Sequence, residues 1–376
     1  MKTKKNKKII LLSNTAWYIY NFRLDLLKLI RSKGFDVYII CPFDKYKEKI
    51  EDMGFKVYEW HLKRNSINPI NELVSIYNLL TIYQRIKPDI VHHFTIKASI
   101  YGSICSWICK TKTTINSFTG LGHLFISNEN KITLIRNIIS PILKLVFSKK
   151  DTKLIFQNSS DRNHLINLKL VTKNNSSVIP GSGINVSYFK PSKKNDGDKF
   201  LKILFPSRLI REKGIFELIK ACSILWEKKV PIKLFIAGKL DKGNRSCLTE
   251  KDIKKLNKQK YIYLIGHVED MRSIYKSVDI VVLPSWREGL SKALLEAASM
   301  EKAIITTNVP GCREIIDHMK SGLLVKKNNP LHIKDSILKL YNEKDLIKKF
   351  GKAARIKVKK EFEIKKINNM TITLYE

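Results

Sequence analysis

Short apolar runs rich in β-branched and aromatic residues alternate with longer segments of helical period along most of this chain. This alternation is typical of parallel α/β layering. In the first half the expected strands are 8–12, 37–41, 56–60, 89–94, 113–118, 153–157 and 177–179. Expected helices between them include Phe22–Ser32, Asn71–Gln84 and Lys97–Trp107. In the second half the expected strands are 202–205, 232–237, 261–264, 280–283, 303–306 and 323–325.

Two such series predict two doubly wound, Rossmann-like α/β domains that face each other across a central cleft. Ligands would bind at the carboxyl ends of the strands. The length of 376 residues suits two domains. We expect an N-terminal domain over 1–190, a polar linker over 191–199, a C-terminal domain over 200–355 and a basic helical tail over 356–376. Packing of that tail on the N-terminal domain is one option.

The charge balance is strongly basic, with 70 Lys and Arg against 34 Asp and Glu and a formal net charge of +36. Such a field attracts nucleic acids, anionic lipids and phosphorylated small molecules. Part of the excess can be compositional, since the chain is also rich in Ile and Asn. A nucleic-acid-binding protein would need a docking module or aromatics interleaved with the basic residues. Neither is present, so we expect no nucleic-acid partner.

Several features favour a cytoplasmic protein that contacts the membrane from its surface. The six cysteines form no CxxC pair, which indicates a reducing compartment. The N-terminus lacks the apolar core of a secretory signal, and no segment has 18 uncharged apolar residues. A basic tail suits an anionic membrane surface; it consists of Lys2, Lys4, Lys5, Lys7 and Lys8.

One segment also has the pattern of an interfacial amphipathic helix. Its apolar residues recur at helical spacing; they are Ile135, Ile138, Ile139, Ile142 and Val146. Such a helix either rests in a membrane interface or packs its apolar face on the first sheet. Pro141 predicts a kink in both cases.

Two absent motifs narrow the class of enzyme. No GxGxxG follows the first expected strand, and no GxxxxGK[ST] occurs anywhere. The sequence therefore does not favour a dinucleotide oxidoreductase or a P-loop NTPase.

The stretch Trp286–Ala297 follows an expected strand and carries two carboxylates. Glu288 lies in the loop that opens a helix, and Glu296 lies about two turns further on. A loop carboxylate can bind sugar hydroxyls, a helical carboxylate can bind ribose hydroxyls, and amides at a helix start can hold a phosphate. Both glutamates could equally be ordinary surface acids, because Glu is a good helix former.

A basic pair follows another expected strand. Ser207 and Arg208 come directly after strand 202–205, and Lys213 opens the next helix. A cation at such a crossing can neutralise a diphosphate, including a departing nucleoside diphosphate whose charge grows as the sugar bond breaks. The alternative is solvated surface charge.

Together these motifs resemble the retaining glycosyltransferases of family four, whose fold is GT-B. The residues that carry the resemblance are Ser207-Arg208, Glu212-Lys213-Gly214, Glu288-x7-Glu296 and Val309–Glu314. The N-terminal half is similar to capsule and O-antigen (CapM-like) glycosyltransferases. It is also similar to N-acetylgalactosaminyltransferases that act on undecaprenyl-diphosphate sugars. The matching segments there are Ser13-Asn14, Tyr20–Arg23, His92–Lys97, Thr119–Gly122, Phe156–Asn158 and Gly181–Asn185.

The resemblance implies a donor site in the second half. Arg208 and Lys213 would hold the diphosphate, Glu296 the ribose, and Glu288 the transferred sugar near its 3- and 4-hydroxyls. Glu288, Arg208 and Lys213 form the expected catalytic set. The further donor-binding residues would be Ser207, Gly289, Leu290, Gly120 and Gly122. The family usually has Pro where this chain has Ser291, which can still cap or start the helix.

The first half is expected to bind the acceptor. Arg23 and Lys97 are the expected ligands of the acceptor's diphosphate, because both lie near the ends of expected strands. His92 or His93 could contact a hydroxyl of the acceptor or donor, with one of the pair facing the crevice and the other packing. A structural role is the alternative for each of the two. Asn158 completes this set.

The expected reaction transfers a sugar, with N-acetylhexosamine first among the candidates, from a UDP-sugar to an undecaprenyl-diphosphate-linked saccharide. It would serve bacterial surface polysaccharide assembly at the inner membrane face. No carboxylate of the first half stands out as a nucleophile, which favours a same-face mechanism without metal or cofactor. The alternatives are a UDP-sugar epimerase or a phosphorylase of GT-B fold, and the nucleic-acid-binding protein weighed above.

Overall fold

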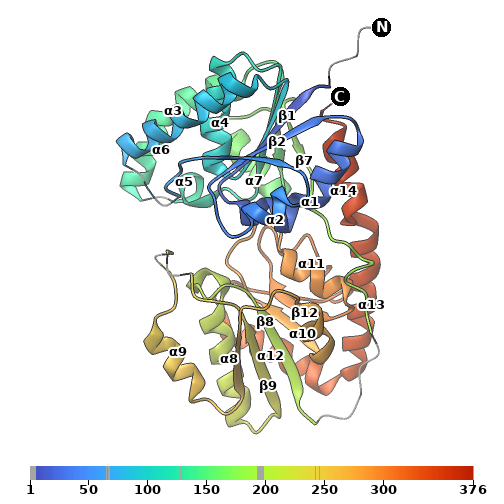
Figure 1. Ribbon diagram of the computed structural model, residues 1–376. Coiled ribbons are helices and arrows are strands. Elements are labelled where there is room, and N and C mark those ends of the chain that lie inside the picture. Colours follow the sequence, from blue (N-terminus) through green and yellow to red (C-terminus); the bar gives the residue numbers. More distant parts are fainter. Residues whose placement is uncertain are drawn as a thin grey trace. The chain divides into compact units, whose positions relative to one another are not determined.

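The computed structural model describes residues 6–64, 66, 68–127, 129–192, 199–241, 243–244 and 246–375. The chain divides into two compact units, each with its own hydrophobic core (Figure 1). The first unit combines Met1–Ser182 with Lys366–Glu376, and the second spans Gly183–Lys365. Most of the expected linker, residues 193–198, and the tail lysines at positions 2, 4 and 5 lie outside the described residues.

The described part of the first unit contains a seven-stranded parallel sheet in the order β3-β2-β1-β4-β5-β6-β7. Its strands are β1 (Lys8–Ser13), β2 (Asp36–Cys41), β3 (Lys56–Glu59), β4 (Ile90–Phe94), β5 (Thr113–Phe118), β6 (Thr152–Phe156) and β7 (Ser176–Val178). Its helices are α1 (Ala16–Ser32), α2 (Lys47–Glu51), α3 (Pro69–Ile86), α4 (Ile96–Ile108), α5 (Gly122–Ile126), α6 (Asn130–Phe147), α7 (Ser159–Asn167) and α14 (Ile364–Ile372).

Helices cover both faces of this sheet, which explains why residues 9–12 of the interior strand β1 are apolar on both faces. In β1, Ile9 and Leu11 pack in the cluster that includes Leu27 of α1. The alternate residues Ile10 and Leu12 pack in a second cluster on the other face. These four side chains of β1 are fully buried.

The second unit repeats this plan with a six-stranded parallel sheet, in the order β10-β9-β8-β11-β12-β13 among the described residues. Its strands are β8 (Leu201–Pro206), β9 (Ile232–Ala237), β10 (Ile262–Gly266), β11 (Ile280–Leu283), β12 (Ala303–Thr307) and β13 (Leu323–Val325). Its helices are the short 3-10 turn η1 (Arg211–Lys213), α8 (Ile215–Glu227), α9 (Glu250–Asn257), α10 (Arg272–Ser277), α11 (Lys292–Ser299), α12 (Pro330–Asn342) and α13 (Lys344–Glu361). The prediction of two doubly wound α/β domains is confirmed.

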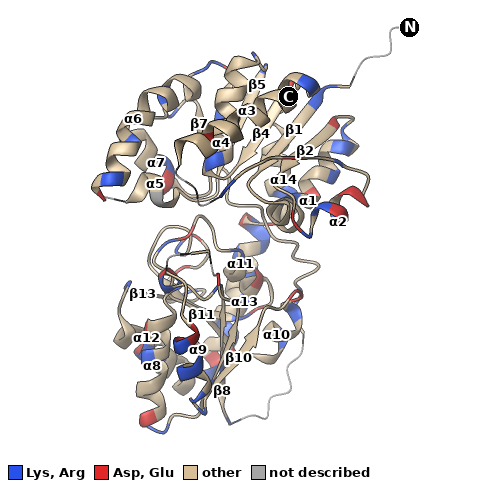
Figure 2. Cartoon of the chain, turned by 60° about the vertical axis from the view of Figure 1, so that its left-hand side comes forward, with Lys and Arg blue, Asp and Glu red and all other residues tan. Residues whose placement is uncertain are grey.

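The last residues of the chain belong to the first unit. Figures 1 and 2 show α14 beside α1. Ile367, Ile372 and Tyr375 are buried in the same cluster as Leu26 and Ile30 of α1. The core of the first unit therefore uses residues from both ends of the chain.

The helix expected over Phe22–Ser32 is longer than predicted, because α1 begins at Ala16. Thr15 caps it, since its hydroxyl accepts a hydrogen bond from the backbone N–H of Tyr18 at 3.1 Å. The aromatic residues before Phe22 thus belong to the helix.

Candidate active site

Three loops of the second unit leave the carboxyl edge of its sheet, where doubly wound folds bind ligands. They follow the neighbouring strands β8, β11 and β12. Residues 207–214 follow β8, residues 284–291 follow β11 and residues 308–314 follow β12. The candidate donor residues Ser207, Arg208, Lys213 and Glu288–Leu290 lie on the first two of these loops.

Glu288 is held in place by both its side chain and its backbone. Its Oε1 accepts a hydrogen bond from the Ser285 hydroxyl at 2.7 Å, and its backbone N–H donates to the Pro310 carbonyl at 3.1 Å. Gly311 lies against its carbonyl: a Cβ at that position would be 2.3 Å from the Glu288 oxygen, and φ is +80°. Only glycine fits there without strain. The β12 loop therefore fixes the position of Glu288.

Lys213 and Glu288 form an ion pair, with the Nζ and Oε1 atoms 2.5 Å apart. Both side chains are largely buried, with exposed fractions of 14% and 13%. The loops are joined again where the Trp286 N–H donates to the Glu212 carbonyl at 2.8 Å. Gly214 permits this approach, because a Cβ there would lie 2.1 Å from the Pro284 oxygen. The structure thus brings two predicted catalytic residues together.

Arg208, on the same β8 loop as Lys213, has a different partner. Its Nη1 forms an ion pair with Asp241, and 51% of its side chain is exposed. The preceding Ser207 is half-buried, and Gly238 packs so closely on it that a Cβ there would lie 1.8 Å from its carbonyl oxygen. Arg208 is therefore anchored at its backbone and accessible at its guanidinium.

Glu296 lies on α11, below the turn that contains Gly289 and Leu290, both half-buried. The Tyr275 hydroxyl of α10 donates to its Oε2 at 3.1 Å. Burial raises the pKa of Glu296, against the opposing effect of Lys292 and this hydrogen bond. Ser291 occupies the N-cap position and starts α11, but its side chain does not cap the helix.

Sequence reasoning did not identify two of these partners. Ser285 is the second residue after β11, and it lies only three residues before Glu288, so a polar residue at a strand exit was the available signal. Tyr275 comes from a different helix, 21 residues before Glu296. No local pattern points to it.

His92 and His93 point to opposite sides of the first sheet and both are fully buried. The His92 ring contacts the Tyr375 hydroxyl at 2.6 Å and the Ser117 hydroxyl at 2.7 Å. The expectation that one of the pair faces the crevice is wrong here, because both rings are packed. Burial lowers the pKa of both, that of His93 to about 4.

His93 has the same kind of environment on the other side of the sheet. Its ring contacts the Tyr83 hydroxyl at 2.9 Å and the Asn116 Oδ1 at 2.7 Å. Gly102 of α4 packs directly on the ring, since a Cβ there would lie 2.6 Å from it. Asn158 is also buried and caps α7, with its Oδ1 accepting from the Asp161 N–H at 2.8 Å. His93 and Asn158 therefore both have structural partners within the first unit.

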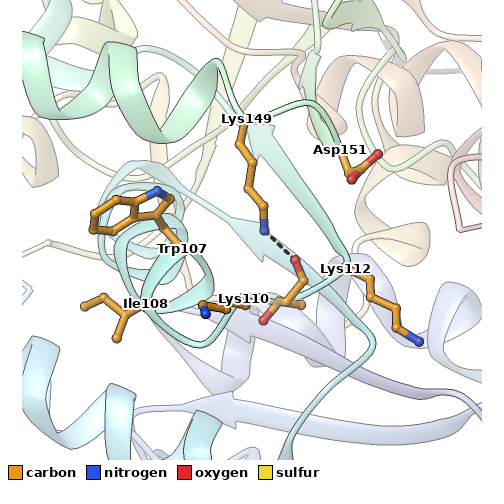
Figure 3. A pocket seen from close by; sticks show the side chains of 7 residues that line it. Trp107, Ile108, Lys110, Lys112, Lys149 and Asp151 are labelled. Carbon is orange, nitrogen blue, oxygen red and sulfur yellow. Dashed lines mark hydrogen bonds between the residues drawn. The ribbon is translucent and has the colours of Figure 1, made fainter.

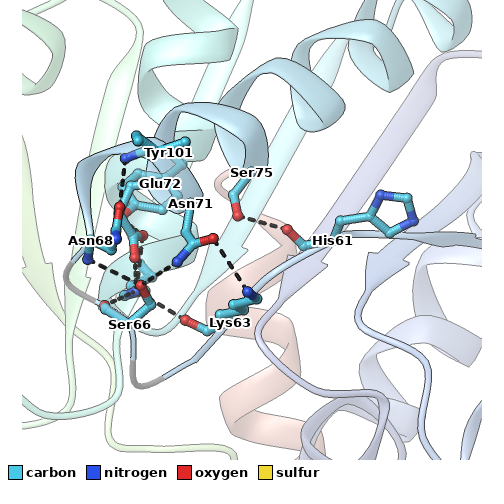
Figure 4. A network of polar contacts seen from close by, with 10 residues as sticks. His61, Lys63, Ser66, Asn68, Asn71, Glu72, Ser75 and Tyr101 are labelled. Carbon is cyan, nitrogen blue, oxygen red and sulfur yellow. Dashed lines mark hydrogen bonds and ion pairs between the residues drawn. The ribbon is translucent and has the colours of Figure 1, made fainter.

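Lys97 of α4 belongs to a polar network with residues of α3 and of the loop before it. Figure 4 shows Ser66, Glu72 and Tyr101 of this network. The Lys97 Nζ contacts both Glu72 carboxylate oxygens at 2.9 Å and the Ser66 carbonyl at 2.7 Å. Tyr101 also donates to Glu72. The cation is therefore neutralised within the first unit, so an acceptor diphosphate would have to compete with Glu72 for it.

Of the remaining predicted residues of the first unit, Gly120 lies between β5 and α5 and Gly122 is the first residue of α5. Both have positive φ, +134° and +56°. A Cβ at Gly122 would lie 2.7 Å from the Ile96 side chain. Glycine is thus needed for the turn itself.

Two cavities, of about 570 Å³ and 360 Å³, lie at the opposite edge of the first sheet. Figure 3 shows the larger one, where Lys112 and Asp151 precede β5 and β6. Lys149 crosses it to donate to the Thr111 carbonyl at 2.5 Å. These cavities are remote in the sheet from the strand ends that carry the candidate residues.

Two searches of the described residues bear on partners. None of their helices is both long enough and apolar enough to cross a membrane. They contain no group of three or more His, Cys, Asp or Glu side chains that could hold a metal ion.

Comparison with known proteins agrees with this geometry. A family model described as "Glycosyl transferase 4-like" matches residues 8–158, and one described as "Glycosyl transferases group 1" matches residues 187–357. Between them the two models match most of both units.

Two relatives and one solved structure resemble the chain over nearly its whole length. The N,N'-diacetylbacillosaminyl-diphospho-undecaprenol alpha-1,3-N-acetylgalactosaminyltransferase of Campylobacter jejuni is 29% identical, over 89% of each chain. The capsular polysaccharide biosynthesis glycosyltransferase CapM of Staphylococcus aureus is 26% identical, over 95% of this chain and 94% of its own. Anabaena HepE, solved with UDP and glucose, has a TM-score of 0.80 at 16% identity, over 98% of this chain and 99% of its own.

The fold and the site together define an enzyme of the GT-B class. The chain belongs to the glycosyltransferases that these family models describe, 4-like in its first half and group 1 in its second.

Proposed function

We propose that this glycosyltransferase transfers an N-acetylhexosamine from a UDP-sugar to an undecaprenyl-diphosphate-linked saccharide, with retention of configuration. The observation that carries the proposal is the Lys213–Glu288 pair, which unites a cation and a carboxylate at the ligand-binding edge of the second unit. The Campylobacter jejuni relative, a diphospho-undecaprenol sugar transferase, supports the acceptor, and the Staphylococcus aureus capsular relative supports the capsule context. Both are transferases, which disfavours the epimerase alternative.

The second unit would bind the donor through three contacts. Arg208 and Lys213 would neutralise the diphosphate, and Glu296 would accept from the ribose hydroxyls. Glu288 would accept hydrogen bonds from the transferred sugar. Gly289 and Leu290, which precede α11, would offer backbone N–H groups.

The cations matter most as the bond to the anomeric carbon breaks. Negative charge then grows on the leaving diphosphate, and a fixed Lys213 stabilises it without reorganisation. In a same-face reaction the leaving phosphate oxygen accepts the proton of the acceptor hydroxyl while the new bond forms on that face. Because Arg208 and Lys213 supply the positive charge, we propose that no metal is required.

We further propose that the first unit rests on the anionic cytoplasmic face of the membrane through α6. Of the predicted stripe, Val146 is buried and Ile139 partly buried, so one edge of the helix packs inward. Four apolar side chains on the same helix are exposed, with exposed fractions of 49% to 64%; they are Leu134, Ile138, Ile142 and Leu145. The helix also carries three basic residues, Lys131, Arg136 and Lys144, and Figure 2 shows basic residues along its length. This combination suits a membrane interface.

The direct test is transfer from a panel of UDP-N-acetylhexosamines to a synthetic undecaprenyl-diphosphate-linked sugar. Thermal shift with UDP, GDP and each UDP-sugar would first select the donor, since ligand at about 100 times its dissociation constant adds roughly 2.7 kcal/mol to folding. Nuclear magnetic resonance of the product would then give its anomeric configuration. Product of inverted configuration would overturn the retaining mechanism, and stabilisation by GDP alone would overturn the donor.

A further inference from the structure

Arg23 of α1 is a buried cation without an acidic partner. Only 3% of the residue is exposed. Its Nε and Nη2 donate to the Tyr18 hydroxyl at 3.2 and 3.1 Å, and its guanidinium lies 4.6 Å from the centre of the Phe94 ring. Within the described part of the chain no carboxylate pairs with it. A buried charge without a counter-ion is costly, so this arrangement favours an anionic ligand.

Ser13, the last residue of β1, adds an unsatisfied hydroxyl beside Phe94, the residue whose ring Arg23 contacts. It is fully buried, and its hydroxyl has no hydrogen-bond partner among the described residues. Ser13 is in register with Phe94 of β4. Strand alternation places its side chain on the face of Ile9 and Leu11, the same face on which α1 packs. A buried hydroxyl without a partner destabilises the folded state.

Thr95 directly follows Phe94 and has a strained backbone. Its φ is +80° and its ψ is 162°, in a region that a β-branched residue rarely adopts. Its hydroxyl is buried without a partner and does not cap α4, which it precedes. The first turn of α4 contains no acidic residue. Lys97, the basic residue of this turn, forms an ion pair with Glu72.

These features converge on one place, because Phe94 connects them. The Arg23 guanidinium lies over the Phe94 ring, Ser13 pairs with Phe94 in the sheet, and Thr95 follows Phe94 in the sequence. We infer that Arg23, Ser13 and the first turn of α4 form an oxyanion site in the first unit, and that its ligand is the diphosphate of the lipid-linked acceptor. The identity of this ligand rests on the proposed function. A guanidinium, two hydroxyls and helix N-terminal amides match the several oxygens of a diphosphate.

If these residues bind the diphosphate, removing their polar groups should weaken ligand binding without lowering the stability of the protein. Ser13→Ala removes an unpaired buried hydroxyl, and Thr95→Gly removes backbone strain, so neither variant lowers the thermal midpoint of the protein. Both nevertheless remove a ligand contact. Thr111→Val is the matched control, because the Thr111 hydroxyl is also buried without a partner but lies before β5, at the opposite edge of the sheet.

The experiment uses the full chain with saturating UDP, which occupies the donor site, and isothermal titration with farnesyl diphosphate. Ser13→Ala and Thr95→Gly are each expected to weaken its affinity about tenfold or more, the effect of losing a charge-assisted hydrogen bond. Thr111→Val keeps the wild-type affinity. Unchanged affinity in both site variants would overturn the oxyanion site.

A second arm distinguishes a lipid diphosphate from a free one. Inorganic pyrophosphate is titrated under the same conditions, and weaker binding than that of farnesyl diphosphate supports the lipid-linked acceptor. Equal affinity for the two would overturn that assignment. Absence of UDP binding to the wild-type protein would instead overturn the proposed function, so the two failures are separate.

Discussion

Lys213 and Glu288 lie 75 residues apart in the sequence, yet their Nζ and Oε1 atoms are 2.5 Å apart. The reason is topological. β8 and β11 are neighbours in the sheet, so the loops that follow them leave the same edge side by side. A diphosphate that binds Lys213 would therefore place its sugar near Glu288, and this relationship leads to the first prediction.

Glu288→Gln keeps the size of the side chain and its contact with Ser285 but removes its charge. Turnover is expected to fall by about 100-fold or more, the loss typical of a transition-state contact, while the dissociation constant of UDP changes less than about threefold. Steady-state kinetics and titration calorimetry measure the two effects. Lys357→Met is the matched control, because it breaks another ion pair of the second unit, with Asp317 at 2.8 Å. Turnover near the wild-type value would remove Glu288 from the catalytic set.

Arg208→Ala is expected to weaken the affinity for UDP by about tenfold or more, because a charge-assisted contact to phosphate is lost. Stability should hardly change, since an exposed ion pair contributes about 0–1 kcal/mol. Arg272→Ala is the control, as Arg272 is also partly exposed and paired with an aspartate, Asp270. If both variants bind UDP equally well, Arg208 does not hold the diphosphate.

Gly311→Ala tests how the β12 loop positions Glu288. Gly266→Ala is the control, because Gly266 has almost the same φ, +79°, but open space where the Cβ would be. Both variants incur the strain of a left-handed alanine, about 1–2 kcal/mol. Only Gly311→Ala also pushes on the Glu288 carbonyl, so it should lose more stability and most of its turnover. Equal losses in urea denaturation and in activity would show that the close contact is unimportant.

Replacing Ile138 and Ile142 of α6 by Glu should abolish co-sedimentation with vesicles rich in anionic lipid. The two side chains would no longer enter the interface, and two negative charges would repel it. Ile356→Glu on α13 of the second unit is the control, since that side chain is also exposed. Deletion of residues 2–8 separates the contribution of the basic tail. Binding that persists in the α6 variant would show that the membrane contact lies elsewhere.

Acidification is expected to destabilise the first unit. Burial lowers the pKa of His93 from its usual 6.5 to about 4, so between these values the unfolded chain binds a proton that the folded unit does not. Stability is complete above pH 6.5 and falls as the pH drops, by about 2 kcal/mol at pH 5. Urea denaturation at pH 7 and pH 5 measures the loss, and His93→Gln should reduce it. An undiminished pH dependence in that variant would assign the effect to other groups, such as His92.

The strands could be predicted to within about a residue or two because each is a short apolar run bounded by polar residues. The start of α1 could not, since its first turn is aromatic and its only signal is the cap Thr15. Within the site, Glu288 and Lys213 follow from their places after strands. Their pairing does not, because it depends on strand order.

The histidines show the reverse problem. Polar residues near a strand end suggested a ligand contact, yet His92 is satisfied by Tyr375, 283 residues further along the chain. A partner at that separation leaves no trace in the local pattern. The apolar stripe of α6 predicts an amphipathic helix. Its periodicity does not show which of the apolar residues pack against the sheet and which stay exposed.

The return of residues 366–376 to the first unit has a consequence for how the protein is made. During synthesis, the ribosome completes the entire second unit before Ile367, Ile372 and Tyr375 emerge. Until then the core around α1 lacks these side chains, and His92 lacks its phenol partner. The part of the chain translated first is therefore the part that finishes folding last.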